Sequence, residues 1–366
     1  MRSITIPKLY SILHERVLPL IADQCDSRLT NLVLLMLGLY KGRSVHLSRI
    51  ASRIPSRARK VCTTERIRRF LSNPAVQVEV WYAATAQTLI QRAAAGGWLH
   101  FIIDSTKIGF GQQLLMVSLA YGRRSLPIAW RWIPYKRGHS STAQQLALLR
   151  LVKGMVPTGV RASLVGDCEF GRHLLLEELD HWGWQYALRQ PGDHLIWPSA
   201  ASAWLRLDWI HLLPNVPHWL SHTLLTAENA YPTSLVLYHQ SGQADAWFLA
   251  TNCTCPRAAI RLYRRRMWIE EMFGDLKDNG FDVEATHLRD SQRLDRLMLA
   301  LALLYVWFIA LGEHLIRTGQ TALVDRADRR DLSLFRLGFD FLDRLLNLSE
   351  DPPHLFFPAF DLVLGG

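Results

Sequence analysis

The chain has 366 residues, 49% of them hydrophobic, which is enough for one large domain or two to three ordinary ones, each with a real core. Its formal net charge is +10, with 35 Arg and 7 Lys, and this balance favours a polyanionic partner. The five cysteines form no Cys-x-x-Cys pair, which argues against a zinc module. Their odd number and the lack of a signal peptide pattern predict a cytoplasmic protein.

Residues 1–95 are predicted to form a helical DNA-binding domain. The stretch 32–39 is apolar without the turn signals that bound strands, and 52–71 is strongly basic. A helix in the basic segment would carry Arg66 and Arg69 on one side, three residues apart. We expect these two arginines to contact DNA, and a solvated cationic face is the alternative for the same pattern.

The pattern changes to strands after this helical part. Two apolar runs, 98–104 and 161–167, each end in an aspartate, Asp104 and Asp167, and are predicted to be buried strands. A hairpin at 122–125 and then a helix are expected between them. The order strand, hairpin, helix, strand, helix, strand predicts an α/β fold with a mixed sheet and helices on its faces.

Helical periodicity disappears over 191–246, where Trp and Pro are frequent, and this segment is predicted to be a β-rich insertion. A strand at 247–251 would return to the core, and one helix is expected over 256–278. The predicted division is a helical domain at 1–95, a catalytic core at 96–190 and 247–317, a β-strand insertion at 191–246 and a C-terminal helical region at 318–366.

The longest apolar run, Leu297–Gly312, has 16 residues and lies in a predicted helix at 291–317. A membrane-spanning helix needs about 20 residues, so a buried core helix and no membrane partner are expected. An integral membrane protein built on 31–40 and 297–312 is the weaker alternative, because both stretches are short.

Four side chains of the predicted helix at 256–278 share one face. Tyr263, Arg266, Glu270 and Lys277 fall within an arc of roughly 60° at about 100° per residue. A phenol, two cations and a carboxylate on one stripe can hold a phosphate and a metal ion together.

Asp104, Asp167 and Glu270 come from different elements and can converge at one edge of the sheet. Such a cluster is costly unless a cation neutralises it, and hard oxygen ligands suit Mg²⁺ or Mn²⁺. Two such ions activate water or a 3′-hydroxyl for attack at phosphorus, which is phosphodiester chemistry. Taken singly, each residue has a plainer alternative, an Asp that caps a turn or a Glu that pairs with Arg266. Glu271 lies about 100° off the stripe, so Glu270 is the predicted ligand.

These residues match the signature of a known family. The spacing Tyr-x2-Arg-x3-Glu-x6-Lys, with the segments 102–106, 165–171 and 247–251, resembles the DDE-type insertion-sequence transposases, in the branch named for insertion sequence four. The matches follow the family's order and cover roughly residues 60–317. The pair Cys168-Glu169 departs mildly from the residues that commonly follow the family's second aspartate.

The resemblance implies a ribonuclease-H-like core with a β-strand insertion between the second aspartate and the glutamate. It also implies that Asp104, Asp167 and Glu270 are the catalytic residues and bind the metal ions, Mg²⁺ with Mn²⁺ as a substitute.

Further contacts with DNA are implied by position within the signature. Tyr263, Arg266 and Lys277 would contact phosphates near the cut, and Trp247 would stack on a flipped base, which needs such an aromatic platform. A core strand residue is the alternative for Trp247.

We therefore expect a transposase that cuts transposon ends and joins the 3′-hydroxyl to target DNA. Its expected partner is double-stranded DNA, both transposon ends and target, bound as a homodimer in association with a bacterial nucleoid. The alternatives are a catalytically silent DNA-binding derivative and a metal-dependent DNA nuclease without strand transfer.

Overall fold

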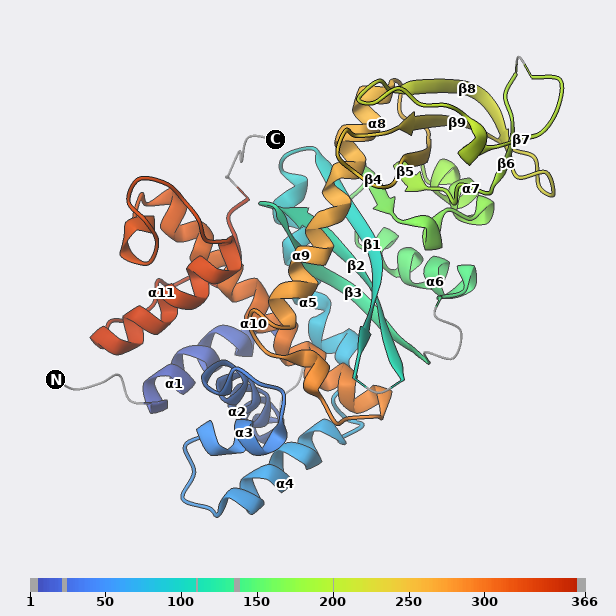
Figure 1. Ribbon diagram of the computed structural model, residues 1–366. Coiled ribbons are helices and arrows are strands. Elements are labelled where there is room, and N and C mark those ends of the chain that lie inside the picture. Colours follow the sequence, from blue (N-terminus) through green and yellow to red (C-terminus); the bar gives the residue numbers. More distant parts are fainter. Residues whose placement is uncertain (1–5, 22–24, 110, 135–138, 200, 361–366) are drawn as a thin grey trace.

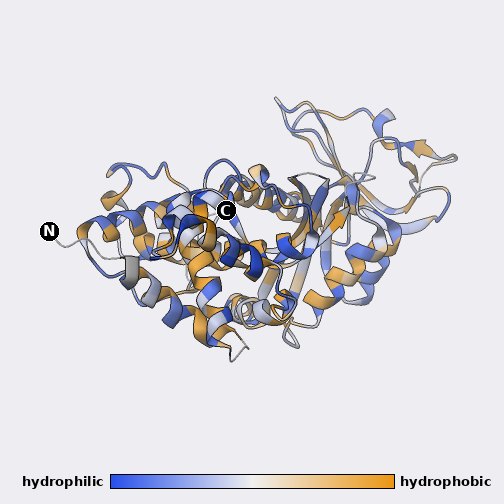
Figure 2. Cartoon of the chain, turned by 90° about the horizontal axis from the view of Figure 1, so that it is seen from below, coloured by the Kyte–Doolittle hydropathy of each residue, from blue (hydrophilic) through white to orange (hydrophobic). Residues whose placement is uncertain are grey.

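A computed structural model describes residues 6–21, 25–109, 111–134, 139–199 and 201–360. Figure 1 shows a helical N-terminal part at one end of the molecule and a long twisted sheet at the other. The helices α9 and α5 lie on opposite faces of this sheet. In Figure 2 many helices carry hydrophilic and hydrophobic residues in alternation, as expected for helices with one buried and one exposed face.

The N-terminal part is built from five helices. They are α1 (Ile6–Val17), α2 (Asp26–Gly42), α3 (Leu47–Arg53), α4 (Lys60–Leu71) and α5 (Val78–Ala94). In α4 the side chains of Thr63, Ile67 and Phe70 are buried at spacings of four and three, which leaves the basic residues on the exposed face. Arg296 is buried and donates to the carbonyls of Leu71 (3.0 Å) and Val76 (3.1 Å), so the end of α4 is fixed to the core.

The first five strands form a mixed sheet in the order β3-β2-β1-β4-β5. Their bounds are β1 (Trp98–Ile108), β2 (Gln112–Tyr121), β3 (Arg124–Pro134), β4 (Arg161–Gly166) and β5 (Gln185–Arg189), with α6 (Thr142–Lys153) and α7 (His173–His181) between the later ones. Strands β1 to β3 are antiparallel, and β4 and β5 run parallel to β1. The predicted hairpin is confirmed at Tyr121↔Arg124. This is the α/β, ribonuclease-H-like core with flanking helices that the resemblance implied.

The sheet opens beside Asp104. Parallel pairing between β1 and β4 ends at Ile102↔Val165, whereas β1 continues to pair with β2 as far as Ile108. Asp104 was expected to end its strand but lies inside β1, opposite Met116 of β2. On its other side, Asp104 has no pairing partner in β4, and β4 ends one residue before Asp167. A gap therefore opens between β1 and β4 at the end of the sheet where both aspartates lie.

The strands of the 191–246 segment continue this sheet. They are β6 (Leu195–Trp197), β7 (Leu205–Arg206), β8 (His218–Leu225) and β9 (Tyr231–Tyr238), and β10 (Trp247–Thr251) joins them to β5. Strand β10 pairs antiparallel with β5 at Leu249↔Arg189, so it returns the chain to the core as predicted.

The helix expected over 256–278 is interrupted. It consists of α8 (Pro256–Tyr263), a 3₁₀ turn (Arg264–Arg266) and α9 (Met267–Leu276), with Pro256 at the start, where its missing N–H costs nothing. The two helices lie in line along one face of the sheet (Figure 1). The tighter turn falls inside the signature, between Tyr263 and Glu270.

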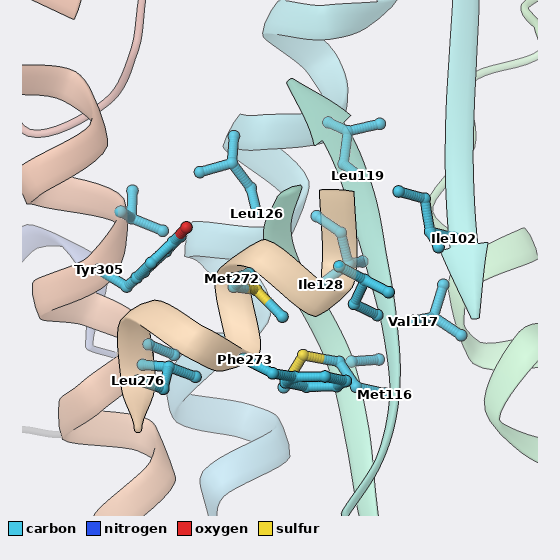
Figure 3. Close-up of a cluster of buried hydrophobic side chains, with 14 of the residues drawn as sticks. Ile102, Met116, Val117, Leu119, Leu126, Ile128, Met272, Phe273, Leu276 and Tyr305 are labelled. Carbon is cyan, nitrogen blue, oxygen red and sulfur yellow. The ribbon is translucent and has the colours of Figure 1, made fainter. Parts of the chain in front are cut away.

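Helix α9, which carries Glu270, is held on the sheet by apolar packing. Met272, Phe273 and Leu276 of α9 lie against the sheet residues Met116 and Ile128 in one buried cluster (Figure 3).

The helices α10 (Ser291–Arg317) and α11 (Leu334–Leu348) complete the fold. Helix α10 is apolar and long enough to cross a membrane, but 94% of its most apolar window lies buried in the fold, as predicted for a core helix.

Candidate active site

One guanidinium lies between two of the predicted carboxylates. Arg266 places Nη1 at 3.6 Å from Asp104 Oδ2 and Nη2 at 2.6 Å from Glu270 Oε1. The side chains of Arg266 and Asp104 are 13% and 12% exposed, so their contact is shielded from water, whereas the Glu270 side chain is 42% exposed. The 3₁₀ turn and the first turn of α9 thus bring Glu270 to the edge where β1 carries Asp104.

Asp104 is buried and crowded by like charges. Burial is the main cause that raises its pKa to about 7, and the charges of Asp167 and Glu270 raise it further. Arg266 and the backbone N–H of Ser105 (2.8 Å to Oδ1) oppose this shift. Burial, with a smaller contribution from the two neighbouring carboxylates, therefore outweighs Arg266 in setting the pKa of Asp104.

Asp167 caps a turn, which was the alternative role considered for it from the sequence. Its Oδ1 accepts from the backbone N–H of Glu169 (2.9 Å) and caps the 3₁₀ turn Cys168–Phe170. The cap fixes the side chain beside the end of β4, where its charge acts on Asp104.

Glu169 holds this edge together and was not among the predicted site residues. It accepts from Ser105 Oγ (2.8 Å) on β1 and from the backbone N–H of Ser140 (2.6 Å), just before α6. Gln145 of α6 donates to its carbonyl at 3.3 Å. The closeness of Glu169 to the second aspartate was its only signal in the sequence, because its partners are distant along the chain.

The residues at this edge fit a hard divalent cation by donor type and by charge. They offer the carboxylate oxygens of Asp104, Asp167 and Glu270, which act on one another as like charges and are the ligand type that Mg²⁺ and Mn²⁺ prefer in proteins. Within the described part of the chain, however, no three His, Cys, Asp or Glu are grouped closely enough to hold a metal ion. Arg266 lies in the space between Asp104 and Glu270, and a metal ion there requires it to move.

Among the described residues, the other signature side chains form no hydrogen bond or ion pair with the three carboxylates, although the charge of Asp167 acts on Tyr263. Tyr263 is buried, burial raises its pKa to about 12, and its ring contacts that of Trp247 edge-on at 5.0 Å. Trp247 is half-buried, with Tyr238 on its other side at 5.8 Å. Lys277 follows the end of α9 and pairs with Glu284 at 2.5 Å. In this structure these side chains pack or pair with protein groups.

Two nearby carboxylates are engaged elsewhere. Glu271 pairs with Arg124 Nη1 at 3.1 Å, which agrees with its predicted place off the stripe. Asp275 is buried and accepts from Arg124 Nε (2.7 Å) and Tyr305 Oη (3.2 Å), so it ties α9 to β3 and α10. Neither side chain contacts Arg266.

A hollow beside the carboxylates adds groups that the sequence did not point to. It has a volume of about 590 Å³ and reaches from Cys168, next to Asp167, to the strands after β5. Arg189, at the end of β5, and Trp209, whose side chain is 72% exposed, line it. A cation and an open indole are groups that bind single-stranded nucleic acid.

The predicted N-terminal contacts are exposed on α4. Arg66 donates from Nε to Asn31 Oδ1 of α2 at 2.6 Å, and Arg69 lies on the same exposed side. Both belong to the helical part and not to the edge that carries Asp104 (Figure 1).

Comparison with known proteins assigns the chain to a family. A family model described as a transposase DDE domain matches residues 98–307, more than half of the chain. Among solved structures, the piggyBac transposase in a cryo-EM synaptic complex with hairpin DNA is similar, with a TM-score of 0.45 and 11% sequence identity, over 94% of this chain and 77% of that one. No curated protein matches the chain. The chain therefore belongs to the DDE transposase family, enzymes that cut and move DNA with divalent metal ions.

Proposed function

We propose that this transposase cuts transposon ends and joins the freed 3′-hydroxyl to target DNA, with Asp104, Asp167 and Glu270 as its catalytic carboxylates. One observation carries the proposal. Asp104 and Glu270 meet on a single guanidinium, and the charge of Asp167 acts on the same site. Two carboxylates on one cation, with a third whose charge acts on the first, are suited to phosphodiester chemistry at the opened edge of the sheet.

The proposed metal ligands are the same three residues, with Mg²⁺ as the natural ion and Mn²⁺ as a substitute. When bound, such ions activate the attacking hydroxyl and stabilise the leaving oxygen at phosphorus. The protein's own contribution is to hold the carboxylates. The cap at Asp167, the network of Glu169 and the packing of α9 fix three separate elements against one another.

Arg266 is proposed to move from the carboxylates to a DNA phosphate near the cut. A guanidinium binds phosphate oxygens in pairs, so the phosphate can replace the carboxylates as its partner. Lys277 is proposed to make a second phosphate contact on release from Glu284. Tyr263 is proposed to contact a phosphate near the cut, which requires this buried side chain to become accessible when DNA binds. Trp247, whose ring contacts that of Tyr263, is proposed to stack on a base that leaves the helix.

The remaining proposals concern assembly. Arg66 and Arg69 on α4 are proposed to hold the DNA end within a domain formed by residues 1–95. Residues 96–190 and 247–317 would form the catalytic core, with 191–246 as its insertion and 318–366, including residues outside the described part, as a C-terminal region. A homodimer on DNA, acting at a bacterial nucleoid, is the proposed active form.

The test is a gel time course with labelled duplexes that carry the inverted repeats flanking the gene. With Mg²⁺ or Mn²⁺ the wild type should nick the end and then join it to a target plasmid, and Asp104→Asn should bind the duplex but do neither. Nicking without joining would show a nuclease. Binding without nicking by the wild type would show a silent derivative, and both results contradict the proposal.

A further inference from the structure

The exposed face of α8 carries a row of arginines that the site described above does not use. Arg257 and Arg261 of α8 and Arg264, the first residue of the following 3₁₀ turn, are exposed, and at α-helical spacing they fall within roughly 60° of one another. The opposite face is buried through Ala259, Ile260, Leu262 and Tyr263. Packing of that buried face fixes α8 on the sheet, so the arginines are presented as a rigid row and not on a loose loop.

These arginines lack acidic partners. Among the described residues, no Asp or Glu forms an ion pair with Arg257, Arg261 or Arg264, in contrast to Arg326 and Arg329, which both pair with Asp331. Like charges held together on one helix face repel each other, which destabilises the free protein. An anionic ligand would relieve this repulsion, so the row is suited to binding one.

The positive surface continues across the start of the sheet. Arg265 lies over the Trp268 ring at 5.9 Å, and Arg161, at the start of β4, lies over the Trp98 ring at 4.4 Å. Between them His100 has its pKa lowered to about 4, first by burial and then by Arg265 and Arg261. The two aromatic rings support the guanidinium groups on a surface that stays cationic.

We propose that this surface, the α8 patch (Arg257, Arg261, Arg264, Arg265 and Arg161), binds the backbone phosphates of a duplex DNA segment outside the cleavage site. From Arg257 to Arg264 the helix rises about 10 Å, which covers about three phosphates of one strand. Helix α8 leads directly into Arg266 and Glu270, so DNA bound at the carboxylates can extend over the patch. This proposal rests on the proposed function. It adds that the α8 patch holds the duplex segment next to the cleavage site.

The experiment compares two triple variants by the salt dependence of DNA affinity. Arg257→Gln, Arg261→Gln and Arg264→Gln together remove the row, and Arg326→Gln, Arg329→Gln and Arg330→Gln remove three exposed arginines from the 325–331 loop as a matched control. Fluorescence anisotropy is measured from about 50 to 200 mM salt on a transposon-end duplex and on an unrelated target duplex.

Loss of the row should reduce the slope of log affinity against log salt by about two to three on at least one duplex, because each phosphate contact contributes about 0.9. The duplex whose salt slope falls shows whether the patch binds transposon-end DNA or target DNA. The control should change the slope by less than about one. A third variant, Arg257→Lys, Arg261→Lys and Arg264→Lys together, should keep the wild-type slope, because it keeps the charge.

Unchanged slopes on both duplexes overturn the proposal. If the variant with unchanged slopes also sediments differently from the wild type without DNA, the row serves a protein interface and the proposal is again wrong. An equal loss in the control overturns it as well, because net charge alone would then explain the effect. Nicking at saturating DNA is measured in parallel and should stay within about three-fold of wild type. A wild type that binds but never nicks contradicts the proposed function, while the slopes still test the patch.

Discussion

Three consecutive arginines in this chain have three different environments. Arg264 is exposed with no acidic partner among the described residues, Arg265 lies against Trp268, and Arg266 lies between Asp104 and Glu270. Of these three arginines, only Arg266, which faces the carboxylates, forms ion pairs with acidic residues in the described structure. The comparison shows that the function of an arginine here follows from its direction and burial and not from its residue type.

The largest expected effect separates two neighbouring glutamates. Glu270→Gln should slow end nicking by at least about 10³-fold, the scale of losing one catalytic group, and leave duplex affinity within about three-fold. Glu271→Gln should nick at close to the wild-type rate, because its side chain pairs with Arg124. Single-turnover nicking and anisotropy measure both variants. An inactive Glu271 variant beside an active Glu270 variant would reverse the assignment.

A smaller effect separates two of the three arginines. Arg266→Gln should slow nicking at saturating DNA by about 10²-fold, the loss that follows removal of one preorganised donor at a reacting centre. Arg264→Gln is the matched control and should nick within about two-fold of wild type under the same conditions. Equal nicking rates for the two variants would mean that Arg266 does not contribute to cleavage, despite its contacts with Asp104 and Glu270 in the free protein.

The third prediction concerns the anchor of α9. Burial outweighs the ion pair with Arg124 and raises the pKa of Asp275 to about 6. The folded state therefore keeps a proton that the unfolded state releases above its ordinary value of 3.8. The contribution of Asp275 to stability is then complete below about pH 4 and is lost as the pH rises through about 6.

Urea unfolding at pH 4, 5, 6 and 7 compares the wild type with Asp275→Asn. The free energy of unfolding of the wild type, relative to the variant, should fall by up to about 3 kcal/mol between pH 4 and 6 and then level off. A constant difference across this range would show that the proton is not held, and an increase would show that the ion pair with Arg124 dominates.

The sequence determined the elements whose signal is local. The apolar helix 291–317 has the bounds that its composition predicts, and the hairpin at 122–125 lies where it was expected. The two apolar strands start at Trp98 and Arg161 as predicted, although β1 continues past Asp104 to Ile108 and β4 ends at Gly166, just before Asp167. Burial periodicity and turn residues repeat within a few positions, so they can be read without knowing the fold. The α/β class follows from the order of these elements.

Only the tertiary structure decided how the side chains meet. Asp104 lies inside β1 because β2 continues to pair with it after β4 has ended. A single predicted helix became α8, a 3₁₀ turn and α9, which changes the faces that the helical spacing had assigned. Lys277 pairs with Glu284, and Arg266 joins two carboxylates that are far apart in the chain. Pairing between strands, burial and ion pairs depend on residues distant in sequence, and no local pattern contains them.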